Sequence, residues 1–112
     1  MENVIEIKSF NFAVRIVNLY KFLSKRKELV LSKQVLRCGT SIGANVAEAE
    51  QAQSSADFVS KMSIALKETA ETKYWLRLLK ETSYISETEF NSIFSDCVEI
   101  EKILVSIIKS AK

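Results

Sequence analysis

The 112-residue sequence contains no proline, no histidine and only 2 glycines. All-β sandwiches and barrels need many tight turns that recruit proline and glycine, so this scarcity disfavours those folds. The absence of histidine removes the commonest general base and the commonest transition-metal ligand together. The 2 cysteines, Cys38 and Cys97, lie far apart and form no C-x-x-C pair. We interpret both as reduced thiols of a protein core rather than as disulfide partners or metal ligands.

Long uncharged runs are also missing. The longest extends only from Cys38 to Ala47, whereas a helix that spans a membrane needs roughly 20 apolar residues. The first residues lack the basic and then apolar pattern of a signal peptide. These features predict a cytoplasmic protein that has no membrane partner.

What the sequence does contain is 47% hydrophobic and 27% charged residues, the composition of an ordinary globular protein. Its length predicts one domain over residues 1–112. Apolar residues recur at helical spacing in four stretches, at about residues 4–27, 32–52, 55–83 and 86–110. Because the connections between them are short, we expect an all-α, antiparallel, up-and-down four-helix bundle.

The predicted core faces follow from the same spacing. In the first helix Ile5, Phe12 and Ile16 share one face, which Phe10 and Val17 widen. In the last helix Ile107 continues the core seam. Its neighbour Ile108, together with Trp75, Leu78 and Val98, lies off the core seams, and we expect these four residues at a subunit interface.

Capping residues mark three helix starts. Ser32 is the expected N-cap of the second helix, and Ser54 or Ser55 that of the third. Ser86 and Glu89 match the S-x-x-E capping box of the fourth.

Gly39 and Gly43 stand four residues apart in the second helix, and Ala47 continues their stripe. Two glycines inside a helix cost roughly 1 kcal/mol each relative to alanine, so a close contact must offset them. Two interpretations remain open: tight packing inside one bundle, or a subunit or ligand contact on a nearly flat surface.

Asn45 falls between core positions of the second helix and needs hydrogen-bond partners there. Glu48, Glu68 and Glu71 are the candidates for a buried polar network that fixes helix register. Helical di-metal sites combine such glutamates with histidines. Since this chain has none, we predict a structural network and no metal or cofactor.

Positive charge is concentrated in the first third of the chain. Residues 1–37 hold eight cations against three anions, a net of +5, whereas residues 38–112 hold 8 cations against 11 anions, a net of −3. Lysine and arginine bind phosphates, which favours a nucleic-acid-binding protein that recognises RNA or an RNA–DNA hybrid through its backbone charge. The candidate contacts are Arg15, Lys21, Lys25, Arg26, Lys27, Lys33 and Arg37.

The alternative function is a structural adaptor that binds a protein, for example a polymerase, and does not touch nucleic acid. The apolar residues off the core seams support this function and self-association equally well. We expect no enzymatic activity, because no nucleophile–base pair is recognisable and no catalytic residue can be named.

The second helix also carries a resemblance. The run Ser41-Ile-Gly-Ala-Asn45-Val-Ala-Glu48, with the later Glu68-x-x-Glu71 pair and the Ser86 helix start, resembles the "four helix bundle protein" family. Founding members of this family are encoded in intervening sequences of bacterial large-subunit ribosomal RNA genes. The family pattern reads S-I-P-S-N-I-A-E-G, so Gly43 replaces its proline and Ala49 its final glycine.

The resemblance covers essentially the whole chain and implies a bacterial protein that assembles as a homo-oligomer, in particular a homopentamer. It also implies similarity to the accessory variability determinant of diversity-generating retroelements, which associates with reverse transcriptase and binds nucleic acid. The family has no established catalytic residues. Ser41, Asn45 and Glu48 are therefore expected to be structural markers only. Together with Gly39, Gly43, Glu68 and Glu71 they make up the predicted structural motif.

Overall fold

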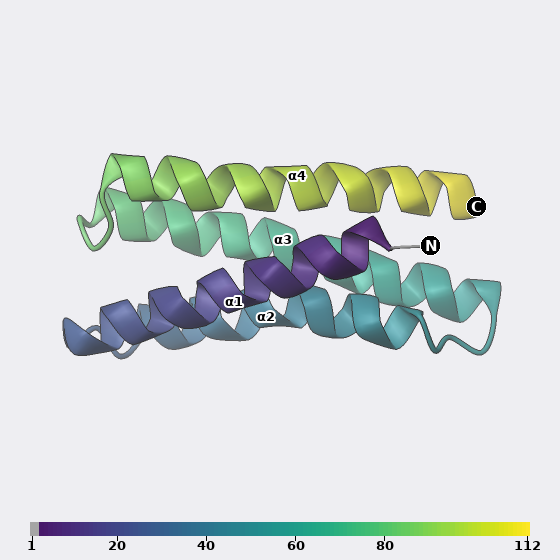
Figure 1. The fold of residues 1–112 in the computed structure, drawn as a ribbon, viewed down its shortest axis with the longest axis horizontal. Coiled ribbons are helices and arrows are strands. Elements are labelled where there is room, and N and C mark those ends of the chain that lie inside the picture. Colours follow the sequence, from purple (N-terminus) through teal and green to yellow (C-terminus); the bar gives the residue numbers. More distant parts are fainter. Residues whose placement is uncertain (1–2) are drawn as a thin grey trace.

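Four helices make up the part of the chain that the computed structural model describes, residues 3–112; positions 1 and 2 of the expected domain lie outside it. They are α1 (Val4–Lys25), α2 (Leu31–Ala49), α3 (Ser55–Glu81) and α4 (Glu87–Ala111). They run alternately up and down in a bundle of 44 × 23 × 20 Å (Figure 1). The predicted all-α four-helix bundle is confirmed.

The helices pack in chain order. α2 lies between α1 and α3, α3 packs against α4, and α1 closes the bundle through a less extensive contact with α4. The α1–α2 and α3–α4 loops therefore share one end of the bundle, and the α2–α3 loop and both chain ends share the other (Figure 1). Residues of the first loop and of the third loop can consequently meet, although they are far apart in sequence.

Side-chain caps fix three of the four helix starts. The Asn3 side chain accepts a hydrogen bond from the Glu6 N–H, and Ser54 does the same for Asp57. Ser86 begins α4 with the complete capping box predicted for it, in which Ser86 and Glu89 each accept the other's backbone N–H. Hydrogen bonds from the Ser86 N–H and hydroxyl hold the pKa of the Glu89 carboxyl below its usual value.

The start of α2 differs from its prediction. Ser32 is not the N-cap: it is buried inside the first turn, and the carboxylate of Glu28 accepts the N–H groups of Val30, Leu31 and Ser32 instead. Burial alone would raise the pKa of Glu28, but these backbone hydrogen bonds outweigh it and lower the pKa. The chain reaches this position because α1 ends at Lys25 and Lys27 takes a positive φ of 65°.

The core is a single apolar cluster to which all four helices contribute. Ile5, Phe12 and Ile16 point into it as predicted. Two expectations for α1 are wrong, because Phe10 is 67% exposed and Val17 is 36% exposed.

The seam of α4 also shifts near its end. Ile108 is buried in the core, while Ile107 packs only partly against it. The prediction that Ile108 lies at a subunit interface is therefore wrong.

Gly39 and Gly43 explain how closely α1 and α2 approach each other. A Cβ on Gly39 would lie 2.7 Å from the Ile16 side chain, and one on Gly43 would lie 3.2 Å from the Ser9 carbonyl oxygen. Both glycines face α1 of the same chain. At both glycines the structure therefore shows tight packing within one bundle, and a subunit contact along the same stripe stays a prediction.

Candidate nucleic-acid interface

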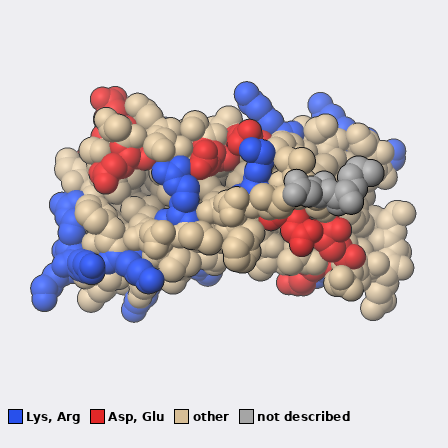
Figure 2. All heavy atoms as spheres, in the orientation of Figure 1, with Lys and Arg blue, Asp and Glu red and all other residues tan. Residues whose placement is uncertain are grey.

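The seven predicted contact residues belong to α1, the α1–α2 loop and the first turns of α2. In Figure 2 blue side chains gather at the end of the bundle where α1 ends and α2 begins. The arginines and the lysines of the set nevertheless have different surroundings. All three arginines contact other parts of the same chain.

Arg15 bridges from α1 to α4. Its Nη1 lies 2.6 Å from Oδ2 of Asp96, and its Nη2 donates to the Ser92 hydroxyl at 3.0 Å. This guanidinium links α1 and α4, the pair of packed helices with the least extensive contact. It is therefore a poor candidate for binding phosphate.

Arg37 also bridges two helices, in this case α2 and α3. Its guanidinium donates to Glu71 and lies 3.6 Å from Oε2 of Glu68, and Trp75 Nε1 donates to Glu71 at 3.0 Å. Glu68 is mostly buried, with its side chain 15% exposed, and its Oε2 has no hydrogen bond. Arg37 supplies the positive charge that this carboxylate requires.

The polar network expected around Asn45 does not form. The Asn45 amide donates to the Ser41 carbonyl one turn earlier at 2.9 Å, and Glu48 pairs with Lys61 at the surface. Asn45 is only half-buried, so it does not need a glutamate from α3. Glu68 and Glu71 instead contact Arg37, which was predicted to bind nucleic acid.

Arg26 connects the two loops that share one end of the bundle. It donates to the Tyr84 carbonyl, and its guanidinium carbon lies 5.5 Å from the centre of the Tyr84 ring and 5.6 Å from that of Phe22. It also lies close enough to the Glu89 carboxylate to lower its pKa further. Sequence reasoning did not reveal this cluster, because Tyr84 is 58 residues away from Arg26.

The four lysines of the set have no such partners. Lys21, Lys25, Lys27 and Lys33 are exposed, and none takes part in a salt bridge within residues 3–112. We call these four residues the lysine end. Their ammonium groups form a local concentration of positive charge.

Beside the lysine end, the outer face of α1 carries exposed apolar side chains. Ile7 is 43% exposed, Phe10 67%, Val14 46% and Val17 36%. The positions follow a spacing of three and four residues, which places them on one side of the helix. We call these four residues the apolar stripe.

A groove with a volume of about 530 Å³ runs along the apolar stripe between α1 and α2. Ile7 and Phe10 line one wall, and Gly43, Ala44 and Ala47 line the other. Trp75, Leu78 and Val98 are half-buried, and their place at a subunit interface stays a prediction.

The remaining features do not suggest chemistry. Cys38 and Cys97 are free and buried, as predicted, and burial raises the pKa of both thiols, that of Cys97 to about 12. A protonated, inaccessible thiol is a poor nucleophile. Among residues 3–112, no group of three or more His, Cys, Asp or Glu side chains could hold a metal ion.

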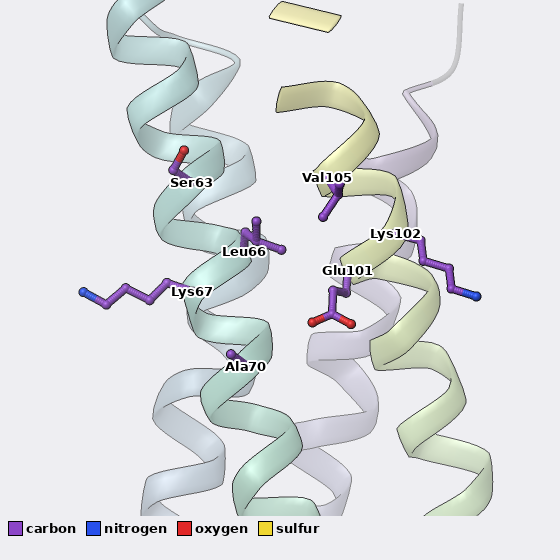
Figure 3. A pocket seen from close by; sticks show the side chains of 7 residues that line it. All are labelled: Ser63, Leu66, Lys67, Ala70, Glu101, Lys102 and Val105. Carbon is purple, nitrogen blue, oxygen red and sulfur yellow. The ribbon is translucent and has the colours of Figure 1, made fainter. Parts of the chain in front are cut away.

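A groove with a volume of about 570 Å³ lies between α3 and α4 (Figure 3). Of its charged residues, Glu101 points between the helices and pairs with Lys73 at 3.0 Å, whereas the Lys67 and Lys102 side chains extend away from the groove. None of the described helices is long and apolar enough to cross a membrane.

Fold and surface together define an all-α four-helix bundle protein with a lysine-rich end. Residues 1–106 match the family model described as 23S rRNA-intervening sequence protein, and the chain belongs to this family. The family suggested by the Ser41–Glu48 motif is thus confirmed. No match to a curated protein was found.

One solved structure is very similar. It is a protein with unknown function from the S23 ribosomal protein family of Bacteroides thetaiotaomicron VPI-5482. Its sequence is 62% identical, the match covers 94% of this chain and 98% of that chain, and the TM-score is 0.92. Neither the family description nor the name of this neighbour contains an enzymatic activity.

Proposed function

We propose that this protein is non-enzymatic and binds nucleic acid through the lysine end. RNA is the first nucleic acid to test. The observation that carries the proposal is the grouping of Lys21, Lys25, Lys27 and Lys33 at one end of the bundle, exposed and without salt bridges among the described residues. The family is named for an intervening sequence of 23S rRNA, which supports RNA as the first ligand to test. A cytoplasmic location is part of this proposal, since RNA is present there and thiols stay reduced.

Backbone charge is the feature of nucleic acid that these lysines fit. Each lysine that contacts a phosphate releases condensed counterions, so the affinity depends steeply on salt. Mobile, hydrated ammonium groups make such contacts without requiring a particular base sequence. The arginines, in contrast, would have to leave Asp96, Glu71 or Tyr84 before they could bind phosphate.

A second proposal concerns the partner of the apolar stripe. Phe10 projects from α1, while Gly43 and Ala44 leave a shallow groove beside it. This surface suits a protein partner in addition to nucleic acid, and we propose another copy of the chain, in a homo-oligomer such as the pentamer implied by the family resemblance. Several copies would bring several lysine ends to one ligand and strengthen a modest contact.

The adaptor function remains the alternative to this self-association. If the apolar stripe binds a different protein, the purified chain stays monomeric. Light scattering of the pure protein separates the two cases: an oligomer supports self-association, and a monomer contradicts it.

Salt dependence tests the proposed nucleic-acid binding. Affinity for a single-stranded RNA is measured by fluorescence anisotropy while the salt concentration is raised from about 50 to 200 mM. Four phosphate contacts predict a slope of about −3 in a plot of log affinity against log salt, and thus a loss of about 50-fold over this range. A variant with alanine at Lys21, Lys25, Lys27 and Lys33 is expected to lose this salt-dependent binding.

The matched control removes four other exposed lysines that form no salt bridge in the described chain, Lys67, Lys102, Lys109 and Lys112. It changes the net charge equally and is expected to retain most of the affinity. No binding at low salt, a flat salt response, or equal losses in both variants would contradict the proposal.

A further inference from the structure

Next to the lysine end, the structure brings together two aromatic rings and a guanidinium group. Phe22 belongs to the last turns of α1, Arg26 is the C-cap residue that follows this helix, and Tyr84 lies in the α3–α4 loop. The guanidinium carbon of Arg26 is 5.6 Å from the centre of the Phe22 ring and 5.5 Å from that of Tyr84. We call these three residues the Phe22 platform.

The Phe22 platform is open to solvent. Phe22 is 41% exposed, Arg26 is exposed and Tyr84 is half-buried. The Arg26 hydrogen bond to the Tyr84 carbonyl and the capping box of α4 hold this surface in place. These contacts keep the Arg26 guanidinium between the Phe22 and Tyr84 rings.

The geometry of α1 places two lysines beside this surface. With 3.6 residues per turn, Lys25 and Lys21 follow each other on the flank of Phe22 that lies opposite Arg26. Arg26 itself is less suited to phosphate, because the Glu89 carboxylate is close to it. A bound strand would thus meet positive charge on one side of Phe22 and flat π surface on the other.

These two chemistries fit different parts of one ligand. Phosphates bind to lysine, and an exposed phenyl ring adds nothing to that contact. Unpaired nucleobases, in contrast, stack on aromatic rings and on arginine planes, and each stacked base contributes about 1–3 kcal/mol. In a duplex the base faces are already stacked on each other, so they are not available to the Phe22 platform.

We infer that the ligand of the lysine end is nucleic acid with unpaired bases, and that at least one base stacks on Phe22 while neighbouring phosphates bind Lys21 and Lys25. This inference rests on the proposed function and names its substrate class. It makes Phe22 a base-contacting residue and leaves Tyr84 and Arg26 as the residues that position the ring.

The test separates the contribution of base stacking to the affinity from that of phosphate charge. Affinities are measured for oligothymidylate and for an abasic DNA strand of the same length, which carries the same phosphates and no bases. The expected result for the wild-type protein is binding of oligothymidylate at least about fivefold tighter than the abasic strand, the equivalent of one stacked base.

Three variants complete the experiment. Phe22→Leu preserves apolar bulk but removes the ring, and is expected to lower oligothymidylate affinity to that of the abasic strand, whose own affinity stays unchanged. Phe22→Tyr preserves the ring and should retain the preference for bases. Tyr74→Leu removes an exposed aromatic ring on α3, outside both the lysine end and the apolar stripe, and should change neither affinity. Thermal unfolding by circular dichroism verifies that each variant folds.

The outcomes distinguish a failure of the stacking inference from a failure of the proposed function on which it rests. If the wild-type protein binds both strands equally, or if Phe22→Leu weakens both equally, the stacking inference is wrong while charge-based binding stands. The second pattern would indicate that Phe22 supports the fold or contacts a protein partner. If neither strand binds at low salt, the proposed function itself is wrong.

Discussion

The two halves of α1 face solvent with opposite chemistries. From Ile7 to Val17 the outer face is apolar, whereas from Lys21 onward it becomes positively charged. Exposed apolar side chains gain no burial energy in a single chain, and close lysines repel each other. The contrast matches the two proposals made above: the apolar stripe has the chemistry that suits a protein partner, and the lysine end has the charge that suits an anion.

The largest expected effect comes from placing charge in the apolar stripe. In a Phe10→Asp, Val14→Asp variant, two side chains that an interface would bury become carboxylates. Because each buried apolar side chain contributes about 1.5–3 kcal/mol, we expect self-association to weaken by at least about 100-fold. Sedimentation velocity measures this change. An unchanged oligomer would show that the apolar stripe is not the contact, and a low helical content would show that the variant does not fold.

An intermediate effect on stability is expected at Glu28, whose carboxylate fixes the geometry of the loop in the lysine end. Glu28→Gln removes the charge that accepts three backbone N–H groups, so we expect the free energy of unfolding at pH 7 to fall by about 1–2 kcal/mol. The apolar stripe lies on α1, away from this loop, and self-association should not change. Urea denaturation measures the loss, and Glu48→Gln, at an exposed surface pair, is the matched control.

The same residue predicts a pH dependence. The pKa of Glu28 is lower in the folded than in the unfolded chain, so its contribution is fully present above the ordinary carboxyl pKa and disappears as the pH falls through the folded pKa. The stability difference between wild type and Glu28→Gln should therefore shrink in acid. A difference that stays constant down to strongly acidic pH would contradict the role of the carboxylate.

The smallest effects distinguish the two kinds of cation. Lys33→Gln removes one phosphate contact, so it should make the salt slope shallower by about 0.7 and leave stability unchanged; the affinity advantage of the wild-type protein then shrinks about two- to threefold between about 50 and 200 mM salt. Arg37→Gln should do the reverse, with a loss of about 1 kcal/mol in stability and unchanged affinity, because Glu68 loses its positive partner. Anisotropy and urea denaturation provide the two measurements. Parallel effects of both substitutions would mean that the arginines and lysines act as one surface.

Local signals account for the part of the fold that could be predicted. The Ser86 capping box needs only residues three apart, and the core positions Ile5, Phe12 and Ile16 need only helical spacing, so the sequence was sufficient for both. The cap of α2 was missed because Glu28 reaches it from inside the preceding loop. Phe10 and Val17 were placed in the core because helical spacing alone does not define how wide a buried face is.

The site was less predictable because its contacts are distant in sequence. Arg15 and Asp96 are 81 residues apart, Arg26 and Tyr84 are 58, and Arg37 and Glu71 are 34. Counting charges could therefore locate the basic segment but could not tell which cations already had partners. The division between bound arginines and free lysines required the fold.

The most direct test of the lysine end is the chemical reactivity of individual lysines. Brief acetylation followed by mass spectrometry measures each side chain with and without single-stranded RNA, and it works in any oligomer. The account predicts that RNA protects Lys21, Lys25, Lys27 and Lys33 and leaves Lys67 and Lys102 as reactive as before. Protection of Lys67 and Lys102 instead, or no protection of any lysine at low salt, would contradict it.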